Sequence, residues 1–143
     1  MITQIYFRFD LPENVFELDA FVQLIQNELL GFDHEIRESS NYFAGFYHKF
    51  KTKENIINVA NADDTCFHDY HYVVTFNKDE NSLQDKVIKL AETWVLKGWT
   101  VSIPDGPLIE DLTRTCYLNE DGKIIWKKHQ VEPRKTKKSR EPD

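Results

Sequence analysis

The order of the apolar segments constrains this chain more than any other feature of its sequence. Segments typical of strands, alternating or rich in aromatic and β-branched residues, occur at 2–10, 41–50, 66–77 and 99–103. Segments with apolar residues at helical spacing follow the first and the third of them. The sequence therefore predicts the order strand, helix, strand, strand, helix, strand.

Both helices carry sequence signals at their ends. Asp10 is placed to cap the first helix with Pro12 in its first turn, and Gly31 stands where the helix should stop. Ser82 is the predicted N-cap of the second helix, and Gly98 ends it. The apolar positions of the first helix are Leu11, Val15, Leu18, Val22, Ile25 and Leu29.

The segments between these elements are less uniform. Residues 33–40 are polar and predict a connection, whereas 51–65 fits either an extension of the preceding strand or a short helix. Residues 112–118 and 123–126 flank Asn119-Glu120-Asp121-Gly122, and Asp-Gly between two apolar runs predicts a hairpin. From residue 127 the chain is charged and lacks apolar periodicity, which predicts disorder.

The element order predicts an α+β fold. A β-α-β-β-α-β order is that of the ferredoxin-like split unit, in which right-handed crossovers place both helices on one face of a four-stranded antiparallel sheet. The C-terminal hairpin would either extend that sheet or fold over its open face. We therefore expect a single domain at 1–126 and a disordered basic tail at 127–143.

Size and composition indicate a soluble protein. The chain has 143 residues, 41% of them hydrophobic, and a chain of this length buries roughly two thirds of its unfolded surface. Residues 1–10 contain Arg8 and Asp10, unlike a signal peptide, and no apolar run approaches the roughly 18 residues of a membrane span. Two cysteines make no disulfide framework. We expect a cytoplasmic, reduced location.

Charge is distributed unevenly along the chain. The net charge is −6, but residues 127–143 hold seven basic and three acidic groups, a net +4. Residues 1–126 therefore carry −10. An acidic body repels nucleic acid and anionic membranes and attracts basic partners, although many soluble proteins are acidic for solubility alone.

No catalytic, metal or cofactor motif stands out. In the string 66–71, Cys66 and His68 would point to one side of a strand and Asp69 and His71 to the other, so they do not form one metal site. Cys66 or Cys116 could pair with a histidine as a nucleophile. Neither cysteine lies at a predicted helix N-terminus, however, where the thiol pKa would be lowered. The five scattered glycines exclude a phosphate-binding loop. We expect no cofactor, no metal and no enzyme activity.

Acidic loop residues are the remaining candidates for function. In the predicted fold they gather at the ends of the sheet, where an acidic rim near aromatic side chains suits a basic protein partner. A solvated rim is the structural alternative. The candidate partner-binding residues are Asp33, Glu35, Glu38, Asp63, Asp64, Asp79 and Glu80.

The chain resembles small acidic immunity proteins of bacterial toxin systems. The resemblance rests on size, an acidic and aromatic-rich body, the lack of catalytic motifs, and the closing hairpin Tyr117-Leu118-Asn119-Glu120-Asp121-Gly122-Lys123. It implies a non-catalytic inhibitor that binds a basic nuclease toxin and blocks its substrate site. An exposed strand edge can also pair with a second copy of the chain, so a homodimer is a further possibility.

Two other functions remain open. An enzyme or small-ligand domain could use the open face of the sheet, with Tyr6, Arg8, His48 and His68 as candidates. An RNA-binding or regulatory module could stack bases on Tyr6 and on Tyr70 or Tyr72. The RNA-recognition signature is absent and the acidic body opposes phosphate, so nucleic acid is the weaker alternative.

Overall fold

The computed structural model describes residues 3–9, 18–40, 45–62, 70–80, 82–104 and 112–130. These residues form two helices and eight strands. In chain order the elements are β1 (Thr3–Phe9), α1 (Leu18–Gln26), β2 (Asp33–Glu38), β3 (Phe46–Lys51), β4 (Asn55–Asn61), β5 (Tyr72–Asp79), α2 (Leu83–Val95), β6 (Trp99–Pro104), β7 (Leu112–Leu118) and β8 (Ile124–Gln130).

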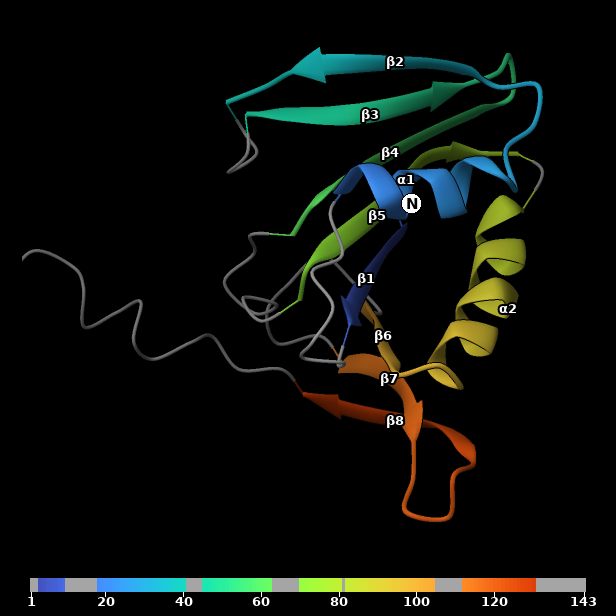
Figure 1. The fold of residues 1–143 in the computed structure, drawn as a ribbon. Coiled ribbons are helices and arrows are strands. Elements are labelled where there is room, and N and C mark those ends of the chain that lie inside the picture. Colours follow the sequence, from blue (N-terminus) through green and yellow to red (C-terminus); the bar gives the residue numbers. More distant parts are fainter. Residues whose placement is uncertain are drawn as a thin grey trace, which may run out of the picture.

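All eight strands belong to one antiparallel sheet (Figure 1). The strand order is β2-β3-β4-β5-β1-β6-β7-β8, so β1 lies in the interior between β5 and β6. Strands β2 and β8 form the two edges, at opposite ends of the sheet. No helix in the described part of the chain has the length and apolar character needed to cross a membrane.

The predicted four-stranded ferredoxin-like fold is wrong, because the structure has a single eight-stranded sheet with two helices. The pair β2–β3 extends the sheet beyond β4, and the hairpin β7–β8 extends it beyond β6. The segment 33–40 was predicted as a connection because it shows no apolar alternation. It is instead the edge strand β2, whose six residues are all exposed and therefore carry no hydrophobic signal.

The ambiguous segment 51–65 contains strand β4, which pairs with β3 and β5. The register between β4 and β5 shifts between Ile56 and Ile57, which is a β-bulge. The extra residue, Asn77, lies on β5, and the side chains of β4 alternate between buried and partly exposed from Asn55 to Val59. Residues 66–69, the first part of the predicted strand 66–77, lie outside the described residues, and β5 begins at Tyr72.

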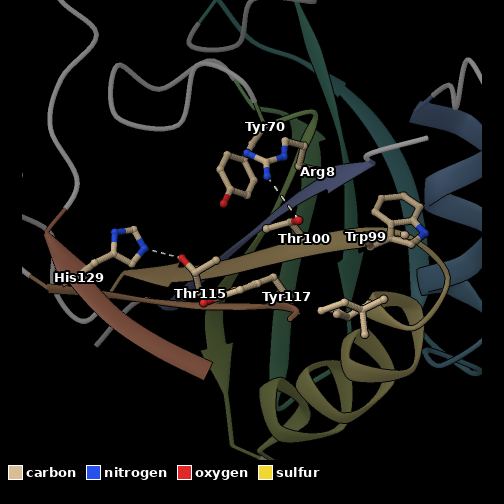
Figure 2. A pocket seen from close by; sticks show the side chains of 10 residues that line it. Arg8, Tyr70, Trp99, Thr100, Thr115, Tyr117 and His129 are labelled. Atoms are coloured by element: carbon tan, nitrogen blue, oxygen red, sulfur yellow. Dashed lines mark hydrogen bonds between the residues drawn. The ribbon is translucent and has the colours of Figure 1, made fainter. Parts of the chain in front are cut away.

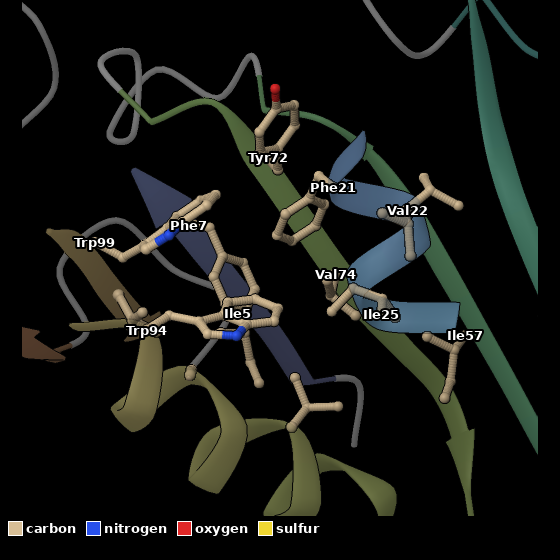
Figure 3. Close-up of a cluster of buried hydrophobic side chains, with 14 of the residues drawn as sticks. Ile5, Phe7, Phe21, Val22, Ile25, Ile57, Tyr72, Val74, Trp94 and Trp99 are labelled. Atoms are coloured by element: carbon tan, nitrogen blue, oxygen red, sulfur yellow. The ribbon is translucent and has the colours of Figure 1, made fainter. Parts of the chain in front are cut away.

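One hydrophobic core joins both helices to one side of the sheet, here called the core face. Ile5 and Phe7 of β1 belong to it, together with the apolar residues of α1 and α2. Phe21 stacks on Tyr72 with ring centroids 4.6 Å apart and contacts Phe7 at 4.9 Å (Figure 3). Such aromatic contacts add to the free energy gained from burying the rings themselves.

The two helices agree in part with the predictions. α1 is described from Leu18, so the predicted start at Asp10 and Pro12 lies outside the described residues. α2 begins at Leu83 as expected, and Ser82 occupies the N-cap position as predicted, but its side chain does not cap the helix. Ser82 makes no side-chain hydrogen bond to the helix, and the carboxylate of Asp79 accepts the N–H groups of Leu83 and Gln84 at 2.6 and 3.0 Å.

The C-terminal hairpin is confirmed, and it extends the sheet through β7. The Asn119 side chain accepts the N–H groups of Asp121 and Lys123, and Gly122 has a φ of 77°, which favours glycine. Trp126 on β8 donates to Glu92 of α2 at 2.8 Å. β8 continues to Gln130, four residues beyond the predicted end of the domain, and residues 131–143 of the predicted tail lie outside the described residues.

Candidate functional site

Three of the predicted partner-binding residues lie on the edge strand β2. Asp33, Glu35 and Glu38 are all exposed. The sheet register places Lys51 directly opposite Asp33 and Lys49 directly opposite Glu35. Opposite charges at directly facing positions attract one another, so these lysines offset much of the negative charge that β2 would present.

The other predicted acidic residues are separate from β2. Asp79 serves as the cap of α2, which commits its carboxylate to the helix. Glu80 is exposed, and its Oε1 lies 3.9 Å from Nζ of Lys78. Asp63 and Asp64 lie outside the described residues. The described part of the predicted set is therefore spread over two places and is not one continuous acidic rim.

The candidates for a site on the open face do not share one face. Ile5 and Phe7 point into the core, so Tyr6 and Arg8 point to the opposite side, here called the second face. His48 lies on the core face, because it is two residues away from buried Phe50 in the same strand. It also lies near Asp19 of α1. The grouping of His48 with Tyr6 and Arg8 is therefore wrong, and His68 lies outside the described residues.

The aromatic residues considered for RNA binding are largely enclosed. Tyr72 stacks on Phe21 within the core. Tyr6 lies on the second face but is 2% exposed, in a small cluster with Ala60 and Val73. The Tyr70 ring meets the Tyr6 ring edge to face, with the ring centroids 6.3 Å apart. Base stacking requires exposed ring faces, which neither Tyr6 nor Tyr72 offers.

His48 is a buried titratable group on the core face. Its Nδ1 lies 2.9 Å from Nε2 of His34, so one ring donates and the other accepts. Its Nε2 lies 3.5 Å from Oδ1 of Asp19 and has no hydrogen-bond partner among the described residues. Burial lowers the pKa of His48, the charge of His34 lowers it further, and Asp19 opposes both.

The described cysteine and histidine residues do not form a reactive or metal-binding cluster. Cys116 is buried in the core, and burial with the nearby Glu92 carboxylate raises its pKa to about 11, so the thiol is protonated at neutral pH. His71 accepts the N–H of Phe9 through Nδ1 at 3.0 Å. Cys66, His68 and Asp69 lie outside the described residues, and no metal-binding group occurs among the rest.

A groove of about 470 Å³ opens where β1, β6, β7 and β8 lie side by side (Figure 2). Its walls combine one guanidinium, an imidazole, two threonine hydroxyls and three aromatic rings. The lining residues are Arg8, Tyr70, Val95, Gly98, Trp99, Thr100, Thr115, Tyr117, Leu118 and His129. The volume is in the range typical of sites for small molecules.

Arg8 is fixed at one wall of the groove. Its Cζ lies 5.2 Å from the centroid of the Tyr70 ring, within the range of a cation–π contact. Its Nη2 lies 3.4 Å from the Thr100 hydroxyl (Figure 2). These contacts orient the guanidinium before any ligand arrives, which reduces the entropy lost on binding.

A chain of hydroxyl groups runs from Tyr70 to the opposite wall. The Tyr70 hydroxyl lies 2.6 Å from Ser102 Oγ, which lies 2.7 Å from Thr115 Oγ1. Thr115 Oγ1 in turn lies 2.6 Å from Nε2 of His129 (Figure 2). Each hydroxyl has one proton, so the direction of donation along the whole chain follows from the protonation of His129 Nε2.

Groove residues such as Thr100, Thr115 and His129 were not among the sequence candidates. A signal was nevertheless present, because hydroxyl side chains stand at every second position, at Thr100 and Ser102 and again at Thr113 and Thr115. Alternation of this kind marks one face of a strand. The register of β6 with β7, which sequence does not give, is what places Ser102 opposite Thr115.

The described lining of the groove differs in charge from the chain as a whole. It contains Arg8 and His129 and no carboxylate, in a protein of net charge −6. The Arg8 guanidinium and the two threonine hydroxyls are hydrogen-bond donors at this groove. No protein-family model, curated protein or solved structure matches this chain.

Proposed function

We propose that the protein is a binding module for a small anionic ligand, a planar carboxylate or phosphate ester, in the groove lined by Arg8 and His129. The observation that carries the proposal is the convergence of the Arg8 guanidinium, the Thr100 and Thr115 hydroxyls and the His129 imidazole on one groove of about 470 Å³. Arg8 supplies charge-assisted donors for the anionic group.

The rest of the groove suits a planar ligand. The rings of Tyr70 and Tyr117 lie among its walls and offer apolar surface to an aromatic or conjugated body. Thr100 and Thr115 bring hydroxyls that can reach polar substituents. A small-molecule site usually has a few polar groups among apolar walls, and the polar groups set the orientation of the bound ligand.

The test is calorimetric titration with benzoate, using benzyl alcohol as the neutral analogue of similar shape. We expect benzoate to bind measurably more tightly than benzyl alcohol. The Arg8→Gln variant should bind benzoate at least about tenfold more weakly, because it loses a charged hydrogen bond worth about 1.5–3 kcal/mol.

The matched control is Lys49→Gln, which removes an equal charge from β3, outside the groove. It should bind benzoate as the natural protein does. Circular dichroism checks that both variants are folded. Equal binding of benzoate and benzyl alcohol, or an Arg8→Gln variant with unchanged benzoate affinity, would contradict the proposal.

A second candidate is the immunity-type function, the capture and blocking of a basic nuclease toxin. It is supported by the exposed carboxylates of Asp33, Glu35 and Glu38 within one six-residue edge strand. Its test is a pull-down from the native host at low and high salt with mass spectrometry of the bound proteins. A stoichiometric basic partner, lost from the Glu38→Lys variant, supports it, and no partner at either salt rejects it.

A further inference from the structure

Strand β2 is a six-residue edge with nothing paired to its outer side among the described residues. All of its residues are exposed, and Ile36 in its middle is 63% exposed. An edge of this length offers a row of backbone donors and acceptors to another strand. Proline or glycine would discourage such pairing, and β2 contains neither of them.

The backbone groups on the outer side of β2 can be identified. Ser39, just after the strand, donates its N–H to the Gly45 carbonyl at 2.9 Å, so its backbone points toward β3. In an antiparallel pair, successive residues alternate between pointing toward the partner strand and away from it. The outward-pointing residues are therefore Glu38, Ile36 and His34.

We propose that β2 pairs antiparallel with β2 of a second copy of this chain, across a two-fold axis at Ile36. In that register Ile36 faces Ile36 of the other copy, Glu35 faces Arg37, and His34 faces Glu38. Glu35, Arg37 and Glu38 thus each meet an opposite charge or an imidazole, and Asp33 faces the polar Ser39. The register also aligns the three outward-pointing residues, each of which exchanges two hydrogen bonds with its counterpart.

Other registers of the same two strands are less favourable. An axis at His34 places Asp33 opposite Glu35, and an axis at Glu38 places two glutamates face to face. A shift of the axis by half a residue places Asp33 opposite Glu38 and His34 opposite Arg37. It also brings outward-pointing groups against inward-pointing ones, which breaks the hydrogen-bond pattern.

The side-chain geometry suits this pairing. Glu35 and Arg37 already lie on one face of β2, with Arg37 Nη1 3.4 Å from Glu35 Oε1. In the pair they occupy non-hydrogen-bonded positions, where facing side chains are closer together. A two-fold contact also closes on itself, so it produces dimers and not fibres. Edge pairing of short strands buries less than a standard interface of about 1,600 Å², so dimerisation should depend on concentration.

The test is sedimentation velocity over a range of protein concentrations, with charge-swapped variants. The natural protein should form dimers. Glu35→Lys and Arg37→Glu should each be monomeric at the same concentrations, because each places like charges opposite one another at two symmetric positions. An equimolar mixture of the two variants should dimerise again, as should the double variant Glu35→Lys/Arg37→Glu, since both restore opposite charges.

Matched controls are Asp85→Lys and Lys89→Glu, which make the same charge changes at exposed positions of α2. Both should dimerise as the natural protein does. Ile36→Pro should be monomeric yet folded, because it removes an outward N–H and leaves the bonds to β3 in place. A natural protein that stays monomeric, assemblies larger than dimers, or a mixture that fails to restore dimers would overturn the proposal.

Discussion

His48 is buried between a carboxylate and a second imidazole, so its protonation is coupled to folding. The groups facing it are Asp19 from α1 and His34 from β2, with Phe46 at its ring edge. Burial lowers its pKa from the ordinary 6.5 despite the aspartate. The folded protein therefore binds a proton at His48 less readily than the unfolded chain does.

This pKa shift predicts a loss of stability in acid. As pH falls below about 6.5 the unfolded chain takes up a proton at His48, while the folded protein takes it up only at its lower pKa, so the free energy of unfolding decreases through that interval. We expect the His48→Gln variant to lose less stability over the same interval. Urea unfolding at pH 7.5, 6.5 and 5.5 measures this, and parallel losses in both proteins would disprove it.

At the scale of elements, α2 shows how a sequence signal can be correct about a helix and its N-cap position and yet miss the side chain that caps it. Ser82 occupies the position before Leu83 with a φ of 54°, a left-handed conformation that serine adopts at a cost. The capping carboxylate comes from Asp79 at the end of β5, so the strand and the helix are joined by these two hydrogen bonds. Negative charge at the N-terminus also favours the helix dipole.

The two residues should therefore respond differently to substitution. Asp79→Ala should lower the free energy of unfolding by about 1–2 kcal/mol, since two backbone N–H groups lose their acceptor. Ser82→Gly should change it by less than about 1 kcal/mol, because glycine relieves the left-handed backbone but is more flexible when unfolded. Denaturant unfolding measures both, and a larger loss from Ser82→Gly than from Asp79→Ala would reverse the assignment.

At the scale of the whole molecule, the two proposed interaction sites lie far apart along one sheet. The groove belongs to β1 and to the strands β6, β7 and β8, whereas the dimer edge is β2 at the other end (Figure 1). Strands β3, β4 and β5 separate them. The immunity-type candidate differs in this respect, because it would use the same edge as the second copy.

This separation predicts that the two sites act independently. Arg8→Gln should dimerise as the natural protein does, and Glu35→Lys should bind benzoate with unchanged affinity although it is monomeric. Sites that share no residues and no neighbouring side chains usually have additive effects. Sedimentation of the first variant and calorimetry of the second measure this, and a dimer-dependent benzoate affinity would show that the sites are coupled.

The sequence by itself determined the elements that have one buried side. Apolar spacing located α2 and the interior strands β1 and β6, and Asp121-Gly122 located the final hairpin, because these patterns follow from local geometry and burial. Only the tertiary structure decided that exposed Asp33–Glu38 is a strand, since an edge strand without a buried face has no periodic signal. It also decided the groove, because the register between β6 and β7 joins residues distant in sequence, such as Ser102 and Thr115.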